Sequence, residues 1–132
     1  MKEVLDSRFL IEYFYSDKTE TKQKTSKKLK ELIQRKEGIV PTIVISETIQ
    51  TVCDKIGKEE AEICYVTLTQ SGLQIQNLTP PIAKHAGLLR SKYRNVPMGD
   101  CIIAATAIAN HARILSDDSH FDTMHETKRT WI

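Results

Sequence analysis

The chain has 132 residues, a formal net charge of +2 and 27% charged residues, as in an ordinary soluble protein. This length allows one domain with a core of its own and is too short for two. No apolar run reaches the ~20 residues needed to cross a bilayer, and the first residues lack the apolar middle of a signal peptide. The three cysteines match neither a zinc pattern nor a disulfide framework. We therefore expect a cytoplasmic protein with no membrane partner, a single domain over residues 1–132, and buried thiols.

Short apolar runs alternate along the chain with longer segments in which apolar residues recur at helical spacing. Thr42 is predicted to cap one helix and Gly57 to end it, while Thr79-Pro80 begins another. In chain order, we predict a strand at 4–5, a helix over 7–14, a solvated lysine-rich helix with a mobile loop at its start within 17–37, a strand at 38–40, helices over 42–56 and 58–70, a half-buried strand over 73–78, a helix from 79 to about 93, a buried helix from about 100 to 110, a strand over 112–116 and a last short strand at 130–132.

The segment 42–56 fits two kinds of element, because Ile43-Val44-Ile45 would also suit a strand. A helix is favoured since Ile45, Ile49, Val52 and Ile56 fall on one face of it. Short strands separated by longer helices, and joined by right-handed crossovers, predict an α/β fold with a parallel sheet covered on both faces.

The stretch from Pro97 to Asp122 is the most informative part of the sequence. Its first half is almost wholly apolar and rich in alanine, which predicts a helix buried close against a sheet. A short apolar run then predicts a buried strand, which ends in Asp117-Asp118. In open α/β sheets, ligands bind at this carboxyl edge of the strands.

Three acids fall where predicted strands end or predicted helices begin: Asp6, Asp100 and Asp118. A fourth, Glu47, lies on the predicted helix after the second strand. If they converge, they form a pocket of oxygen ligands with no His or Cys in the pattern, which favours Mg²⁺ or Mn²⁺ over zinc. Clustered carboxylates raise one another's pKa, so a cation is needed to keep them all ionised. Two ions held in this way lower the pKa of a bound water and stabilise both the attacking and the leaving oxygen of a phosphodiester.

Three of these four positions also have a purely structural interpretation, whereas Asp6 is the best individual candidate for a functional residue. Asp100 would serve as a helix N-cap, Asp117-Asp118 as a turn, and Glu47 as a solvated helix residue. The lysine-rich segment 17–37 is expected to be a solvated face, and a phosphate-contacting patch is the alternative. His120 is expected at the surface, near the acids.

The motifs around the four acids resemble those of the PIN-domain ribonucleases, and the chain length resembles that of the VapC-type toxins. The resemblance covers nearly the whole chain in the same order. It is carried by Val-Leu-Asp6-Ser7, Ile-Ser-Glu47-Thr-Ile, Gly-Asp100-Cys-Ile-Ile-Ala-Ala-Thr-Ala and Ile-Leu-Ser116-Asp117-Asp118-Ser-His-Phe121.

The resemblance implies a three-layer α/β/α sandwich with a central parallel sheet, an RNA substrate and a homodimer. It makes Asp6, Glu47, Asp100 and Asp118 the catalytic residues and the ligands of Mg²⁺ or Mn²⁺. We therefore expect a metal-dependent endoribonuclease that hydrolyses RNA phosphodiesters, as the toxin of a toxin–antitoxin pair with an antitoxin protein as partner.

Two other functions fit parts of the sequence. The first alternative is a non-catalytic RNA-binding module of the same fold, which would bind RNA through Lys22 to Lys36. A phosphoacceptor signalling domain also clusters aspartates at a sheet edge, but it requires an acid pair on the first strand. Here the first strand is followed by Asp6 alone, so we favour the nuclease.

Overall fold

Five short strands form one sheet in the computed structural model, which describes residues 1–132. All pairs are parallel, in the order β3-β2-β1-β4-β5. No helix is both long and apolar enough to span a bilayer. The strands are β1 (Glu3–Leu5), β2 (Gly38–Pro41), β3 (Gln74–Gln76), β4 (Arg113–Leu115) and β5 (Arg129–Thr130). The helices are α1 (Ser7–Tyr15), α2 (Thr19–Arg35), α3 (Thr42–Lys55), α4 (Lys58–Thr69), α5 (Pro80–Lys92), α6 (Met98–Ala109) and the 3₁₀ helix η1 (Ser119–Thr123).

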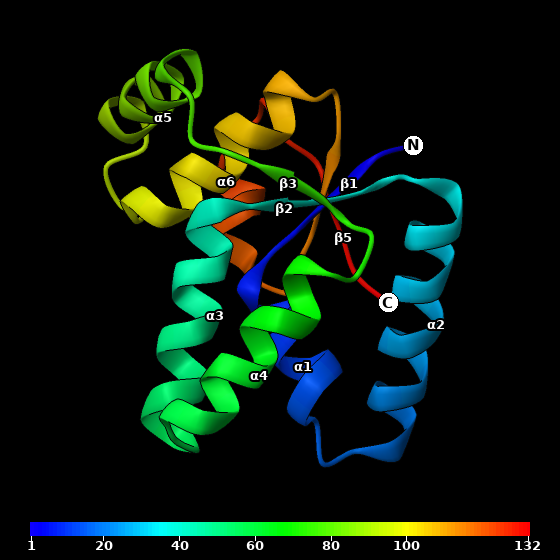
Figure 1. The fold of residues 1–132 in the computed structure, drawn as a ribbon. Coiled ribbons are helices and arrows are strands. Elements are labelled where there is room, and N and C mark those ends of the chain that lie inside the picture. The colour runs from blue at the N-terminus through cyan, green and yellow to red at the C-terminus, as the bar shows by residue number, and fades with distance from the viewer.

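The connections place helices on both faces of this sheet. The chain runs outward from β1 to β2 and then to β3, and it returns past β2 and β1 to form β4 on the other side of β1. Because the crossovers are right-handed, this reversal puts α5 and α6 on the opposite face of the sheet from the earlier helices. Accordingly, α6 contacts β1 and β4, whereas α2 contacts β2. In Figure 1 the strands pass between α6 on the left and α2 on the right. The predicted three-layer α/β/α sandwich is confirmed.

The predicted buried helix is α6, which packs on β1 and β4 through its small residues. Ala104, Ala105 and Ala107 are fully buried and let the helix lie close to the sheet. The helix ends as predicted at Asn110, and His111 leaves it with a φ of 51°, in the left-handed region. The cap predicted at Thr79 is also present, because its side chain accepts a hydrogen bond from the Ile82 N–H.

Several local predictions are wrong. Thr42 is the first residue of α3 rather than its cap, because Pro41 holds the N-cap position at the end of β2. The buried face of α3 is formed by Val44, Thr48 and Val52, and Ile56 is exposed. The packing of α3 against α1 and α4 selects this face, which periodicity alone does not identify.

Two further expectations need adjustment. Cys64 and Cys101 are buried as predicted, but Cys53 is exposed on α3. The loop expected at the start of the lysine-rich segment is limited to residues 16–18, because α2 already begins at Thr19.

A buried acid at the amino edge of the sheet is paired with partly exposed cations. The Glu3 side chain on β1 is only 2% exposed, and its Oε2 lies 2.6 Å from Lys28 Nζ of α2. Arg113 Nη2 of the neighbouring strand lies 3.8 Å from the same oxygen. The chain therefore supplies its own cations to the one acid buried at this edge.

Candidate metal centre

The ends of β1 and β4 meet at the carboxyl edge of the sheet, where the direction of strand progression reverses. Leu5 and Leu115 are paired in the ladder, so Asp6 and Ser116 emerge side by side. Ser116 Oγ donates a hydrogen bond of 2.6 Å to Asp6 Oδ2. The reversal of strand order opens a crevice at this type of position, which is where ligands bind in open α/β sheets.

Asp6 is held in place by the first turn of α1. Its Oδ1 accepts a hydrogen bond of 2.8 Å from the Ser7 N–H, and its side chain acts as the N-cap of α1. The residue is only 3% exposed. Burial raises the pKa of Asp6, the hydrogen bonds from Ser116 and Ser7 oppose this rise, and the nearby charge of Asp118 adds to it.

Asp118 is fixed by the turn that follows β4. Its backbone N–H donates to Ser116 Oγ over 3.0 Å, so the same hydroxyl contacts both aspartates. Asp118 also caps η1, because its Oδ1 accepts a hydrogen bond of 2.9 Å from the His120 N–H. Phe121, fully buried in the core, anchors this turn. The predicted turn role of Asp118 is therefore present, and it is compatible with ligand binding.

Asp100 and Glu47 approach from helices on opposite sides of this edge. Asp100 is the third residue of α6, so the alternative that it serves as the N-cap is wrong, since Pro97 occupies that position. Burial raises the pKa of Asp100 to about 6, the charges of Asp118 and Asp6 add to this rise, and His120 opposes it. The pKa of Glu47 rises to about 7, chiefly through burial and then through the charges of Asp6 and Asp100.

The four predicted acids thus lie close enough to act on one another's ionisation, and no Lys or Arg forms an ion pair with any of them. Arg8, the nearest strong cation, is paired with Asp117 instead. A structural role for Glu47 as a solvated helix residue does not explain why it faces this cluster.

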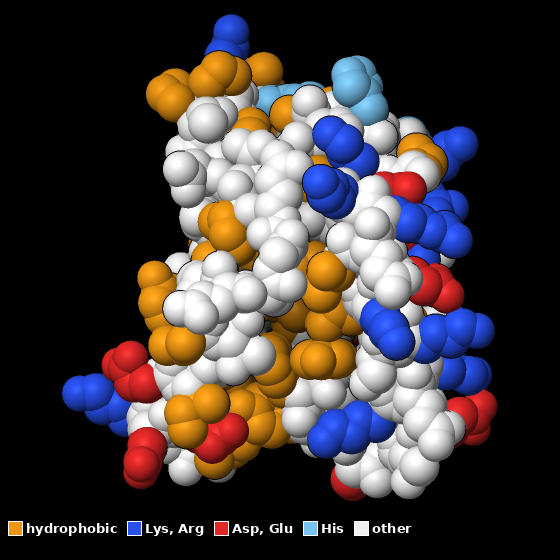
Figure 2. Space-filling model, turned by 45° about the vertical axis from the view of Figure 1, so that its right-hand side comes forward, with side chains coloured by type: hydrophobic (Ala, Val, Ile, Leu, Met, Phe, Trp, Pro, Cys, Tyr) orange, Lys and Arg blue, Asp and Glu red, His pale blue; other side chains and the backbone are white.

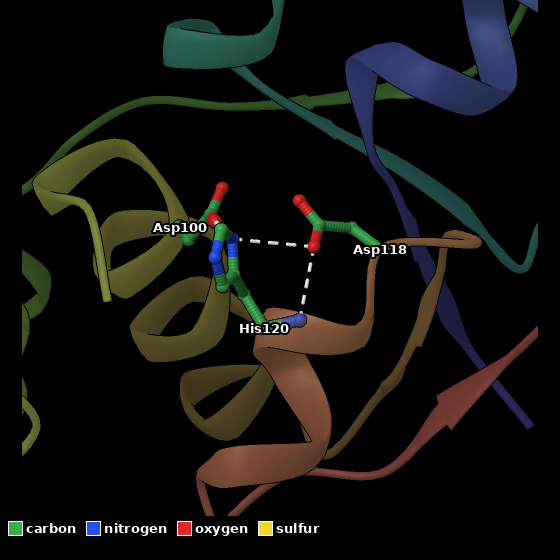
Figure 3. Close-up of side chains that lie close together, drawn as sticks. All are labelled: Asp100, Asp118 and His120. Atoms are coloured by element: carbon green, nitrogen blue, oxygen red, sulfur yellow. Dashed lines mark hydrogen bonds and ion pairs between the residues drawn. The ribbon is translucent and has the colours of Figure 1, made fainter. Parts of the chain in front are cut away.

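His120 is a member of this centre that the sequence pattern did not include. Its Nδ1 lies 3.3 Å from Asp100 Oδ2 and 3.2 Å from Asp118 Oδ1. Figure 3 shows its ring between the two carboxylates, with Asp100 reaching in from α6. The sequence placed His120 at the surface near the acids but outside the ligand set, and the structure brings its ring into contact with two of them. The only sequence signal was its position two residues after an aspartate at a strand end.

Comparison with known proteins identifies the family. A family model of the PIN domain matches residues 4–126. This chain belongs to the PIN domain family. No curated protein matches the sequence.

Solved structures with the same fold confirm the architecture of this PIN domain. VapBC2 from Rickettsia felis, bound to a DNA fragment from its promoter, has a TM-score of 0.80 at 18% identity over 100% of this chain and 99% of that chain. FitAcB from Neisseria gonorrhoeae has a TM-score of 0.75 at 19% identity over 96% and 95%. VapC20 from Mycobacterium tuberculosis, a sarcin-ricin loop cleaving toxin, has a TM-score of 0.71 at 14% identity over 92% and 94%. At these identities the likeness establishes the fold alone.

The donor set of this PIN domain fits a divalent cation. Glu47 Oε1 is buried and has no hydrogen-bond partner, and burial, followed by the charges of Asp6 and Asp100, raises the pKa of this carboxyl. A buried carboxylate oxygen without a partner is costly, and a cation would satisfy it. Carboxylate oxygens are also the ligands that Mg²⁺ and Mn²⁺ prefer. The assignment of these acids as ligands stays a prediction.

The first prediction concerns stability and pH in the absence of divalent ions. The pKa of Glu47 is about 7 in the folded protein, against an ordinary value of 4.5. Stability from this group is therefore fully present below pH 4.5 and is lost as the pH rises through about 7. Glu47→Gln removes this loss, so in EDTA near pH 8 it should unfold at a temperature higher by ~3–6 °C, equivalent to about 1 kcal/mol after discounting for solvent screening.

Thermal melts from pH 5 to 8 in EDTA measure this effect. Asp54→Asn is the control, because Asp54 is an exposed carboxylate on the same helix. A Glu47→Gln protein that is no more stable than the parent near pH 8 would contradict the electrostatic origin of the shift.

The second prediction concerns Gly99, which leaves room for Glu47. A Cβ at Gly99 would lie 3.0 Å from Glu47 Oε2, so Gly99→Ala must push the carboxylate away by a few tenths of an ångström. We expect Gly99→Ala to weaken Mn²⁺ binding by about three- to tenfold, with no loss of thermal stability, because Ala is the better helix former. Calorimetric titration and melts test this. The control is Gly87→Ala on α5, where a Cβ meets nothing within 4 Å, and equal Mn²⁺ affinities in both variants would refute the steric argument.

Proposed function

We propose that this chain is a divalent-metal-dependent endoribonuclease and the toxin of a toxin–antitoxin pair. The observation that carries the proposal is the gathering of four acids at the strand-order reversal of a PIN fold, with no Lys or Arg to neutralise them. Within that cluster, the buried Glu47 Oε1 has no partner. A protein without a use for this arrangement would be more stable with amides at these positions, so the cluster favours catalysis over passive binding.

The residues of this centre would have two roles, binding ions and positioning the ligands. Asp6, Glu47, Asp100 and Asp118 would hold the ions, and Ser116 keeps Asp6 and Asp118 in register through its two hydrogen bonds. Bound ions would supply an activated water and stabilise the charge that develops on the leaving oxygen. Burial of Asp6 keeps bulk water away from one side of the centre.

A hollow beside the acids suits the backbone of an RNA strand. It has a volume of about 290 Å³ and begins at Ser7, the residue after Asp6. Its lining holds two cations, Arg8 and Lys55, and two acids, Glu12 and Asp117. Asp117 is paired with Arg8, so Lys55 is the cation that would contact a neighbouring phosphate. We propose that this hollow positions the nucleotide next to the scissile phosphate.

The third prediction tests the nuclease. Purified protein incubated with end-labelled RNA should cleave it with Mg²⁺ or Mn²⁺ and not with EDTA. Asp6→Asn or Asp100→Asn should reduce the rate by at least about 100-fold, because each removes an oxygen ligand from the ion site. Asp54→Asn is the matched control, since it removes one exposed charge away from the centre, and it should cut at the parental rate.

The same assay separates the nuclease from the non-catalytic alternative. An RNA-binding module would bind RNA without metal and cleave none. Cleavage that survives in Asp100→Asn, or that does not require a divalent ion, would reject the proposed function.

An apolar groove supports the toxin part of the proposal. It has a volume of about 500 Å³ between α1, α2 and α4, and eight of its eleven lining residues are hydrophobic. Figure 2 shows this hollow as a band of hydrophobic side chains, with Lys and Arg gathered on the α2 side. Exposed apolar surface of this kind marks an interaction site. VapBC2 and FitAcB are complexes of paired chains, so we propose that an antitoxin segment with apolar and acidic residues docks here. The homodimer stays a prediction.

The fourth prediction tests this groove on its exposed rim. Val66 of α4 lines the groove and is 51% exposed, whereas Ile63 on the same helix is 54% exposed and lies outside the lining. Val66→Asp should weaken binding of the antitoxin encoded beside this gene by about tenfold or more, while RNA cleavage is retained. Ile63→Asp is the matched control. Pull-down and calorimetry measure the affinity, and equal effects of the two substitutions would place the antitoxin elsewhere.

A further inference from the structure

His120 contacts the acidic centre, although it is not one of the four acids proposed as metal ligands. Its Nδ1 is 3.3 Å from Asp100 Oδ2 and 3.2 Å from Asp118 Oδ1. One ligand atom from each of these three residues can be chosen so that all lie within 4.8 Å of one another. In Figure 3 the imidazole projects from the start of η1 into the space between the two carboxylates.

The backbone of this turn determines where the imidazole lies. The His120 N–H donates to Asp118 Oδ1 over 2.9 Å, and the Asp118 N–H donates to Ser116 Oγ over 3.0 Å. The Ser116 hydroxyl in turn donates a hydrogen bond to Asp6 Oδ2. On the other side, Phe121 is fully buried. The half-exposed ring of His120 therefore extends from a fixed point of the centre, rather than from a loose surface loop.

The distances match those between ligands of a single ion. Two ligands that each lie about 2.1 Å from the same ion are about 3.0–3.4 Å apart in octahedral or tetrahedral geometry. Both separations of His120 Nδ1 fall in this range. A hydrogen bond from Nδ1–H to the carboxylates gives the same distances, and the metal titrations below distinguish it from ligation.

Resting on the proposed function, we propose that His120 is a nitrogen ligand of the ion held by Asp100 and Asp118. The site is then a mixed oxygen and nitrogen site. Imidazole binds first-row transition ions such as Mn²⁺ and Co²⁺, whereas Mg²⁺ prefers oxygen. His120 therefore biases this centre toward a transition ion without changing its affinity for Mg²⁺.

The test compares metal binding by the full chain and by His120→Ala, using MgCl₂, MnCl₂ and CoCl₂ as probes. Calorimetry gives the three affinities, and the visible absorption of bound Co²⁺ reports whether nitrogen is among its ligands. The control is His125→Ala, an exposed histidine on the same segment whose ring faces Tyr93 instead of the acids. Thermal melts verify that both variants are folded.

We expect His120→Ala to weaken Co²⁺ binding by at least tenfold, since loss of even an outer partner of a metal ligand costs about that much. Mn²⁺ binding should weaken by a smaller factor, Mg²⁺ affinity should change by less than about twofold, and the Co²⁺ spectrum should shift. Unchanged Co²⁺ affinity and spectrum would overturn the inference. An equal loss for Co²⁺ and Mg²⁺, or a gain for every ion, would also overturn it, because His120 would then position or compete instead of ligating.

The failure of this inference is distinct from that of the proposed function. If the parent protein binds no divalent ion, the metal-dependent nuclease and the ligand role both fail. If the parent binds Mg²⁺ and Co²⁺ and His120→Ala behaves as the parent does, only the role of His120 is lost.

Discussion

The hydrogen bond between Ser116 and Asp6 is the interaction around which the rest of this centre is arranged. It joins the ends of β1 and β4, two neighbouring strands whose connections leave toward opposite faces of the sheet. Because the Ser116 hydroxyl also accepts the Asp118 N–H, one side chain sets the spacing of two aspartates. The second turn of α3 and the first turn of α6 then need only approach this pair to bring in Glu47 and Asp100. Small residues on α6 permit that approach.

The same arrangement explains why the centre is costly to the folded chain. Burial and mutual repulsion raise the pKa of three of its acids, and hydrogen bonds from hydroxyl and amide groups offset only part of that effect. Arg8 is close enough to oppose the rise at Asp6, but its own partner is Asp117. An electrostatic cost of this kind is expected where a protein positions charged groups for a ligand. The packing of α6 against the sheet holds Asp100 in this position.

The sequence predicts those parts of the structure that depend on local signals. The buried helix was predicted from its almost wholly apolar, alanine-rich run, and the cap at Thr79 was predicted from the Thr-Pro pair. The buried face of α3 was predicted wrongly, since contacts with α1 and α4 choose between two overlapping apolar stripes. Spacing alone did not single out Glu47; family resemblance did. His120 was expected near the acids but not in contact with them, because a half-exposed histidine in a turn leaves no periodic signal and the 3₁₀ helix determines where its ring lies.

The two edges of the sheet differ in how their buried acids are neutralised. Glu3 at the amino edge has cations from the chain itself, because its Oε2 is paired with Lys28 and Arg113 lies nearby, although its Oε1 is buried without a hydrogen-bond partner. At the carboxyl edge no lysine or arginine plays that part. Under the proposed function, a divalent ion from solution would supply the missing positive charge, and the stability of this edge would then follow the free concentration of that ion. Protein isolated with a chelator and protein isolated with divalent salt are therefore expected to differ most in local opening around the second turn of α3 and the first turn of α6, while the lysine-bound edge behaves alike in both.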